Sequence, residues 1–271
     1  MKLLRRILLT VVITLTVIFV VVQWIAPVAL SFYAARKAPP VARVVPTGLK
    51  DRSVSQAPGK KLSYFGYEFE VPWSDIDETK TTLYPKDKPD KTRVILVFRS
   101  GLRLMVTAIP PRDWVNFLAT EMKSSPQAVE SAFGKSDYRF AKTLYEFTPD
   151  KMSHWALSWH VHAREEFLLL IKSIVLSESA DDGIFNLQNQ SCKGFQQGDP
   201  QVRKERIIVQ LYSDEGSVEF VFFQKEYQNS ASVTQPEINR IVQSLHKAPQ
   251  DGATAAQVAK RQRPGNTFGK E

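Results

Sequence analysis

The chain has 271 residues, of which 43% are hydrophobic and 24% charged, an ordinary composition for a globular protein with a sizeable core. The net charge of +8 is unevenly spread, because residues 1–60 hold nine Lys or Arg against one acid while residues 61–247 hold 23 against 25. A fold that grips phosphates keeps its basic excess on the fold. This distribution argues against a nucleic-acid-binding domain, and we expect no nucleic acid as a partner.

The N-terminal residues 1–35 predict a membrane anchor. After MKLLRR, the sequence ILLTVVITLTVIFVVV at 7–22 carries no charge, and the uncharged run continues to Ala35. This run exceeds the ~20 apolar residues that cross a bilayer as a helix. Pro27 marks a kink or the end of the span.

A cleaved signal peptide is the alternative interpretation of this segment. Small-residue cleavage sites would be ALS at 29–31 or FYA at 32–34. The apolar core is longer than the roughly 7–15 residues of a signal peptide, so we expect an uncleaved single-pass anchor. Trp24, Phe32 and Tyr33 lie near its outgoing end, where aromatic rings favour the membrane interface.

Orientation depends on the charges that flank the span. Basic residues are equally dense on both sides, at 2–6 and at 36–43. Because the preceding flank is short and a long following domain is translocated largely regardless of its charge, we expect the domain on the extracytoplasmic side of a bacterial inner membrane. The lone Cys192 excludes an intramolecular disulfide framework and fits either compartment.

Two further segments lie outside the expected globular domain at 61–247. Residues 36–60 contain four prolines and few large apolar side chains, which predicts an extended spacer that lifts the domain off the membrane. The tail at 248–271 has little to bury, and we expect it to be disordered.

The domain begins with β patterns. Phe65, Tyr67, Phe69 and Val71 alternate with polar or small residues, which predicts a half-buried strand ended by a proline. Two β-rich runs then flank Ser100-Gly101, a short hairpin signal.

Helix signals replace the β patterns over about 113–177. The expected N-caps of four helices are Asp113, Ser124, Ser136 and Thr148. The last helix contains EEFLLLIKSIVL, which is too apolar for a surface helix and is therefore expected to be buried.

Strands return after residue 183 as IFNLQ, KGFQQ, RIIVQLY and VEFVFFQ, the last two joined by a tight turn. TQPEINRIVQSLH then predicts an amphipathic closing helix with Thr234 and Glu237 at capping-box spacing. The sequence therefore predicts an α+β fold, with a mainly antiparallel sheet, a helical insertion and a closing C-terminal helix.

The closing strand pair and the helix ending in IVQSLH resemble the C-terminal part of the PsbP-like fold and related exported bacterial domains of unknown function. The resemblance covers about 40 residues. It implies an accessory or binding module rather than an enzyme, and the helical insertion departs from that pattern.

The stretch HWALSWHVH at 154–162 holds three of the four histidines. As a strand it would place His154, His160 and His162 on one face, as a zinc site requires. As a turn leading into a helix, which its context favours, the three rings do not converge. His154, His160 and His162 are thus the candidate metal ligands, and we expect a partly packed histidine cluster instead.

Other catalytic signatures are missing. The sequence has no HExxH, no GxSxG and no glycine-rich phosphate loop, and Asp181-Asp182 before a glycine is typical of a turn. We expect no catalytic residues and no cofactor. The hypothesis is therefore a membrane-anchored accessory or binding module with an envelope or membrane protein as partner. The alternatives are a metal-dependent hydrolase and a cytoplasm-facing binder of anionic lipid or nucleic acid.

Overall fold

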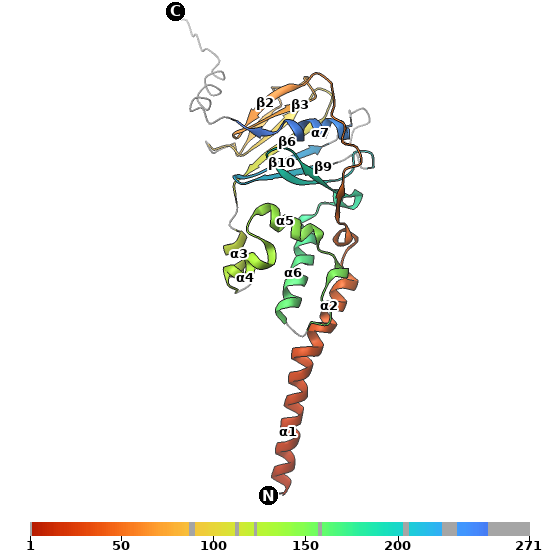
Figure 1. The fold of residues 1–271 in the computed structure, drawn as a ribbon, viewed down its shortest axis with the longest axis vertical. Helices are drawn as coiled ribbons and strands as arrows, with labels where there is room; N and C mark the ends of the chain where they lie inside the picture. The colour runs from red at the N-terminus through yellow and green to blue at the C-terminus, as the bar shows by residue number, and fades with distance from the viewer. Residues whose placement is uncertain are drawn as a thin grey trace, which may run out of the picture.

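A computed structural model describes residues 2–86, 90–111, 114–121, 124–156, 159–202, 206–223 and 232–248. The chain is an α+β protein in three tiers along its long axis (Figure 1). A long N-terminal helix forms one end, a helical layer follows, and two β-sheets form the other end. The expected α+β class and mostly antiparallel sheet are confirmed.

The larger sheet has eight strands in the order β1-β7-β8-β9-β10-β6-β5-β4. All neighbouring pairs are antiparallel except β1 and β7, which are parallel. The four returning strands form where the sequence predicts them, and so does the hairpin around Ser100-Gly101. The strands are β1 Pro46–Gly48, β4 Thr82–Tyr84, β5 Arg93–Val97, β6 Arg103–Ile109, β7 Ile184–Gln188, β8 Lys193–Gln197, β9 Arg206–Ser213 and β10 Gly216–Phe223.

A second sheet of β2 (Lys60–Tyr64), β3 (Tyr67–Val71) and β11 (His246–Lys247) packs over the first. The single strand expected through Phe65 is wrong, because Phe65 and Gly66 both have positive φ angles and form the two-residue turn between β2 and β3. Alternation alone does not separate a strand from a tight hairpin turn.

The closing helix α7 (Gln235–Ser244) has the expected capping box of Thr234 and Glu237. It packs against β3, and its apolar side joins a core that includes Val209 and Phe220 of the large sheet. The opposite face of the large sheet, with Phe195 and Tyr212, packs on the helical layer. Both faces are covered there, which is why β9 and β10 are so apolar.

The helical layer contains α3 (Trp114–Glu121), α4 (Pro126–Phe133), α5 (Asp137–Glu146) and α6 (Trp159–Val175), with 3₁₀ turns at Pro149–Lys151 and Glu178–Asp182. Ser136 caps α5 as expected, whereas the N-cap of α4 is Ser125 rather than Ser124. Thr148 precedes the first 3₁₀ turn without a side-chain hydrogen bond, and Asp113 lies outside the described residues.

Helix α6 is only half buried, so the expectation of a buried helix is wrong for one of its sides. Leu168 and Lys172 are buried and α6 contacts α2 and α5, but Ile174 is 69% exposed, and Leu170 and Val175 are also exposed. With neighbours on one side only, α6 buries one stripe and leaves the other uncovered.

The N-terminal helix is continuous over α1 (Lys2–Val20), a π-helical turn (Val21–Ile25) and α2 (Ala26–Lys37). Pro27 does not end it. The amide of Ala26 donates to the carbonyl of Val21, five residues back, and this wider turn accommodates a proline that lacks an N–H. Within the described residues, one helix, Val11–Lys37, is long and apolar enough to cross a membrane.

Residues 36–60 are not the extended spacer that the sequence predicts. They form a 3₁₀ turn at Pro40–Arg43, in which Ala42 is fully buried, and then strand β1 at the edge of the large sheet. The remaining residues run along α7, where the side-chain amide of Asn239 donates to the carbonyls of Asp51 and Ser53. This segment is part of the domain.

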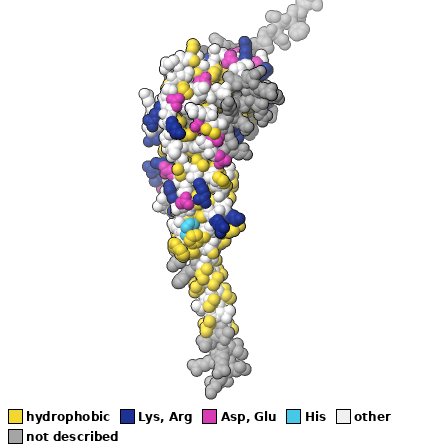
Figure 2. Space-filling model, turned by 90° about the vertical axis from the view of Figure 1, so that its right-hand side faces the viewer, with side chains coloured by type: hydrophobic (Ala, Val, Ile, Leu, Met, Phe, Trp, Pro, Cys, Tyr) yellow, Lys and Arg dark blue, Asp and Glu magenta, His cyan; other side chains and the backbone are white. Residues whose placement is uncertain are grey.

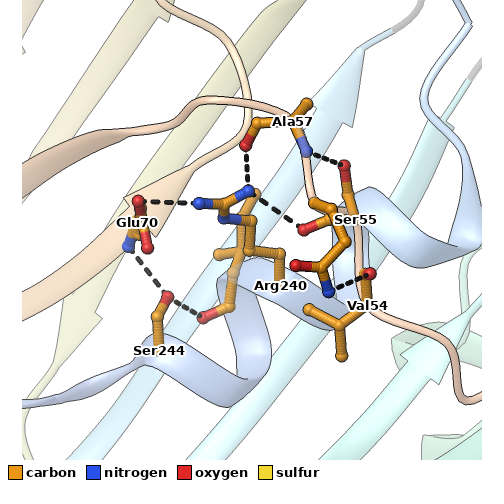
Figure 3. A network of polar contacts seen from close by, with 8 residues as sticks. Val54, Ser55, Ala57, Glu70, Arg240 and Ser244 are labelled. Carbon is orange, nitrogen blue, oxygen red and sulfur yellow. Dashed lines mark hydrogen bonds and ion pairs between the residues drawn. The ribbon is translucent and has the colours of Figure 1, made fainter.

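Arg240 of α7 fixes the same segment (Figure 3). Its guanidinium donates to the carbonyls of Ser55 and Ala57 and forms a 2.9 Å ion pair with Glu70 of β3. The amide of Glu70 donates in turn to the hydroxyl of Ser244. The expected spacer, residues 36–60, is held on the domain by hydrogen bonds from distant side chains to its backbone carbonyls, and we call it the strap. Such bonds leave no pattern in the local sequence. Of the expected tail, residues 249–271 lie outside the described residues.

Candidate functional site

The two candidate histidines whose side chains are described lie in different surroundings. His154 belongs to the turn before α6, where its ring stacks on Phe32 of α2 at 4.3 Å and its Nδ1 lies 3.1 Å from the hydroxyl of Ser31. His162 lies within α6 and is almost fully buried. His160 is also in α6, but its side chain lies outside the described part.

Neither described histidine is arranged as a metal ligand. The Nε2 of His162 lies 2.6 Å from the carbonyl of Ala156, and because a carbonyl only accepts, this nitrogen carries the hydrogen. Its Nδ1 is buried without a hydrogen-bond partner in the described structure. No group of three His, Cys, Asp or Glu side chains among the described residues is placed to hold a metal ion.

These contacts fix a short loop at 153–156. The buried carboxylate of Glu165 accepts a 2.8 Å hydrogen bond from the amide of Ser153, and His162 binds the carbonyl of Ala156. His154 ties the same loop to Ser31 of the N-terminal helix. The polar residues of α6 therefore position a loop, and that loop holds the side chain of Trp155 outward, 79% exposed.

Helix α2 is packed into this part of the domain. Ser31 is fully buried, and its hydroxyl donates to the carbonyl of Val28, which leaves the oxygen free to accept from His154. The last turns of α2 present small side chains to a core formed by Ala42, Met152 and Leu169. Those small residues are Ala34 and Ala35, and Ala38, directly after the helix, packs on the same core.

Lys172 of α6 is a fully buried charged side chain of the helical layer. Its ammonium donates to three backbone carbonyls at 2.7–2.9 Å, those of Val44, Tyr145 and Phe147. Burial lowers the pKa of this ammonium to about 8. All three donors are engaged, so Lys172 joins the strap, α5 and α6 rather than acting as a nucleophile.

A small pocket of about 120 Å³ lies between α5, α6 and the sheet. Its walls are mainly apolar, with Phe140, Leu144 and Ile171 among them. Tyr145 also lines it, and burial raises the pKa of its phenol to about 12 while the hydroxyl accepts from Gln197. Sites for cofactors and drug-sized ligands usually have 300–1,000 Å³, so this pocket suits a few waters or one small apolar group.

No protein-family model, no curated protein and no solved structure matches the chain. The resemblance of β9, β10 and α7 to PsbP-like domains therefore stays a prediction.

Cys192 also has a structural setting. It is buried in the core between the two sheets, and burial raises the pKa of its thiol. A thiol with a raised pKa forms little of the reactive thiolate near neutral pH. It is best described as a packing residue.

Proposed function

We propose that this chain is a non-enzymatic accessory or binding domain, held at the extracytoplasmic side of a bacterial inner membrane by an uncleaved N-terminal helix. The observation that carries the proposal is the packing of one side of α2 against the domain, through the buried Ser31 and the stacked pair Phe32–His154. These contacts support retention of the segment in the mature protein.

The alternative of a cleaved signal peptide conflicts with these contacts. Both small-residue cleavage sites, at 29–31 and 32–34, fall inside α2. Cleavage at the first site would leave His154 without Ser31, and cleavage at the second would also remove Phe32. The loop at 153–156 would then lose its contact with α2, and the core of Ala42, Met152 and Leu169 would lose part of its packing against that helix.

The length of the helix also supports an anchor. The uncharged run from Ile7 to Ala35 spans ~42 Å at 1.5 Å per residue, which matches a bilayer with its headgroup layers at ~40–45 Å. From Val11 onward its large apolar side chains are mostly exposed within the described structure. Exposure of so much apolar surface to water is unfavourable, so this surface is expected to contact lipid.

The hydrolase hypothesis has little support in the geometry. His162 and Glu165 bind the backbone of the loop at 153–156, and the donors of Lys172 are bound to carbonyls. Stoichiometric zinc in the purified full-length chain, lost on His162→Ala and His160→Ala substitution, would contradict the proposal and restore a metal site.

The anchor is tested by the intact mass of the mature chain. Expressed in a bacterium and purified from membranes, the protein is expected to retain its N-terminus and a mass near 30.7 kDa, and to resist extraction by alkaline carbonate. A chain that starts at 32 or 35 and leaves the membrane in carbonate would contradict the proposal.

Orientation is tested separately with spheroplasts. Protease added from outside is expected to digest the domain while a cytoplasmic marker stays intact, because the short basic flank before Ile7 stays inside. Digestion only after lysis would place the domain in the cytoplasm. The basic pair Arg36 and Lys37 at the end of α2 would then be the cause.

A further inference from the structure

Trp155 is unusual among the large side chains of the domain. The residue is 79% exposed, although tryptophan is highly buried on average. It lies edge-on to Phe32 at 5.5 Å, and on α2 the side chains of Leu30, Phe32 and Tyr33 are exposed as well. We call Leu30, Phe32, Tyr33 and Trp155 the foot patch.

The outward position of Trp155 is fixed by the fold. Its loop is held on three sides, by Ser31 through His154, by Glu165 through the amide of Ser153, and by His162 through the carbonyl of Ala156. Two of these partners, Glu165 and His162, are almost fully buried. Buried polar side chains thus hold an apolar ring away from the core of the domain. This arrangement indicates that the ring contacts something less polar than water.

The foot patch is continuous with the candidate span, so its position relative to the bilayer follows from the rise per residue of the helix. If the hydrocarbon core begins at Ile7, its ~30 Å are crossed by ~20 residues and end near Pro27. Leu30, Phe32 and Tyr33 then fall in the headgroup layer, where amphipathic rings favour the interface. Trp155 contacts Phe32 and lies at the same level.

Charges are arranged to match. Arg36 and Lys37 end α2 just beyond the foot patch. Arg43, at the end of the 3₁₀ turn that follows, donates to the carbonyl of Ala35 and pairs with Asp150. Figure 2 shows hydrophobic side chains gathered where the domain meets the N-terminal helix, with Lys and Arg side chains beyond them, interspersed with Asp and Glu. An apolar zone followed by a charged one fits the passage from acyl chains to headgroups.

We propose that the foot patch inserts into the interfacial layer of the bilayer that α1 spans, so that the domain stands in one fixed orientation on a phospholipid surface. The proposal rests on the membrane anchor proposed above. The exposed stripe of α6 is excluded from this contact, because Ile174 lies ~22 Å further along the helix than Trp159.

The test uses the full-length chain in lipid nanodiscs, with Cys192→Ala as the background. An environment-sensitive fluorophore is attached after Trp155→Cys, after Ile174→Cys as the matched exposed control on the same layer, and after Ile18→Cys as the control within the span. Quenching is measured with lipids spin-labelled near the headgroup and with aqueous iodide. Nanodiscs of zwitterionic and of anionic lipid are compared. Insertion of the rings should occur in both, whereas attraction of the basic residues to lipid phosphates should depend on the anionic lipid.

The probe at position 155 is expected to be quenched several-fold more by spin-labelled lipid, and several-fold less by iodide, than the probe at 174, in both kinds of disc. A probe at 155 that matches 174, while the probe at 18 is quenched by lipid, would overturn the foot contact and leave the anchor standing. Strong quenching of the probe at position 18 by iodide would overturn both the foot contact and the membrane anchor. A second measurement compares the unlabelled chain with its Trp155→Phe variant. The variant should lose part of the quenching of tryptophan fluorescence by brominated lipids, and unchanged quenching would also count against the contact.

Discussion

A chain that begins at Lys61 is expected to be less stable than one that begins at Ala38 by on the order of 5 kcal/mol. Both fragments lack the N-terminal helix, so the difference isolates residues 38–60. Without them, Asn239 and Arg240 each lose two carbonyl acceptors, and Lys172 loses Val44. Each lost hydrogen bond costs ~1 kcal/mol, and a donor left buried and unpaired costs more.

This loss is comparable to the whole stability of a domain, ~5–15 kcal/mol. Urea unfolding followed by circular dichroism measures it, and the shorter fragment is expected to unfold at a much lower midpoint or to be unfolded in water. Val54→Ala in the longer fragment is the matched control, because this side chain is exposed on the same segment. Equal midpoints for the two fragments would mean that residues 38–60 are the loose spacer that the sequence predicts.

The substitution Lys172→Met is expected to cost about 2–4 kcal/mol at pH 7. Methionine fills a similar volume but donates nothing, so the carbonyls of Val44, Tyr145 and Phe147 lose a common partner, at ~1–3 kcal/mol for each one that stays buried. Relief of the buried charge offsets part of this loss. Lys142→Met on the neighbouring α5 is the control and should change stability by less than ~0.5 kcal/mol, because Lys142 is half exposed in a surface ion pair.

The cost of Lys172→Met is also expected to rise with pH. The pKa of Lys172 is lowered to about 8 by burial, from an ordinary value of 10.5, so the folded chain releases this proton first. Between pH 8 and 10.5 the unfolded chain binds more protons, and the wild type gains up to about 3 kcal/mol relative to the variant. The same stability contribution is lost as the pH falls from 10.5 to 8, and below pH 8 the difference between the two proteins is constant. Parallel stability curves for the two proteins from pH 7 to 10 would show that Lys172 is not a buried ammonium.

Several elements were predictable because their signals are local. The strands β7 to β10 follow from short apolar runs bounded by turn residues, and α7 follows from the capping box of Thr234 and Glu237. The α+β class follows from the order of these elements. Where the local pattern was ambiguous, as at Phe65 and Gly66, the prediction failed, because alternation continues through a two-residue turn.

The candidate site was less predictable. HWALSWHVH offered His154, His160 and His162 as candidate metal ligands, with a partly packed histidine cluster expected instead. Which contacts the rings make came only from the structure, where His154 and His162 help to hold the loop at 153–156. Lys172 left a signal that was missed. A single lysine within the apolar run LLLIKSIVL indicates a buried charge whose partners must be found elsewhere in the fold.

The sequence by itself determined the class of fold, most strand and helix positions, and the single apolar N-terminal helix, because these depend on residues two to four positions apart. Only the tertiary structure decided that residues 36–60 are a strap, that α2 is built into the domain, and that Trp155 points outward beside Phe32. Those contacts join Asn239, Arg240 and Lys172 to main-chain carbonyls far away in the chain. Every residue carries the same carbonyl, so nothing in the sequence marks which ones the fold will use.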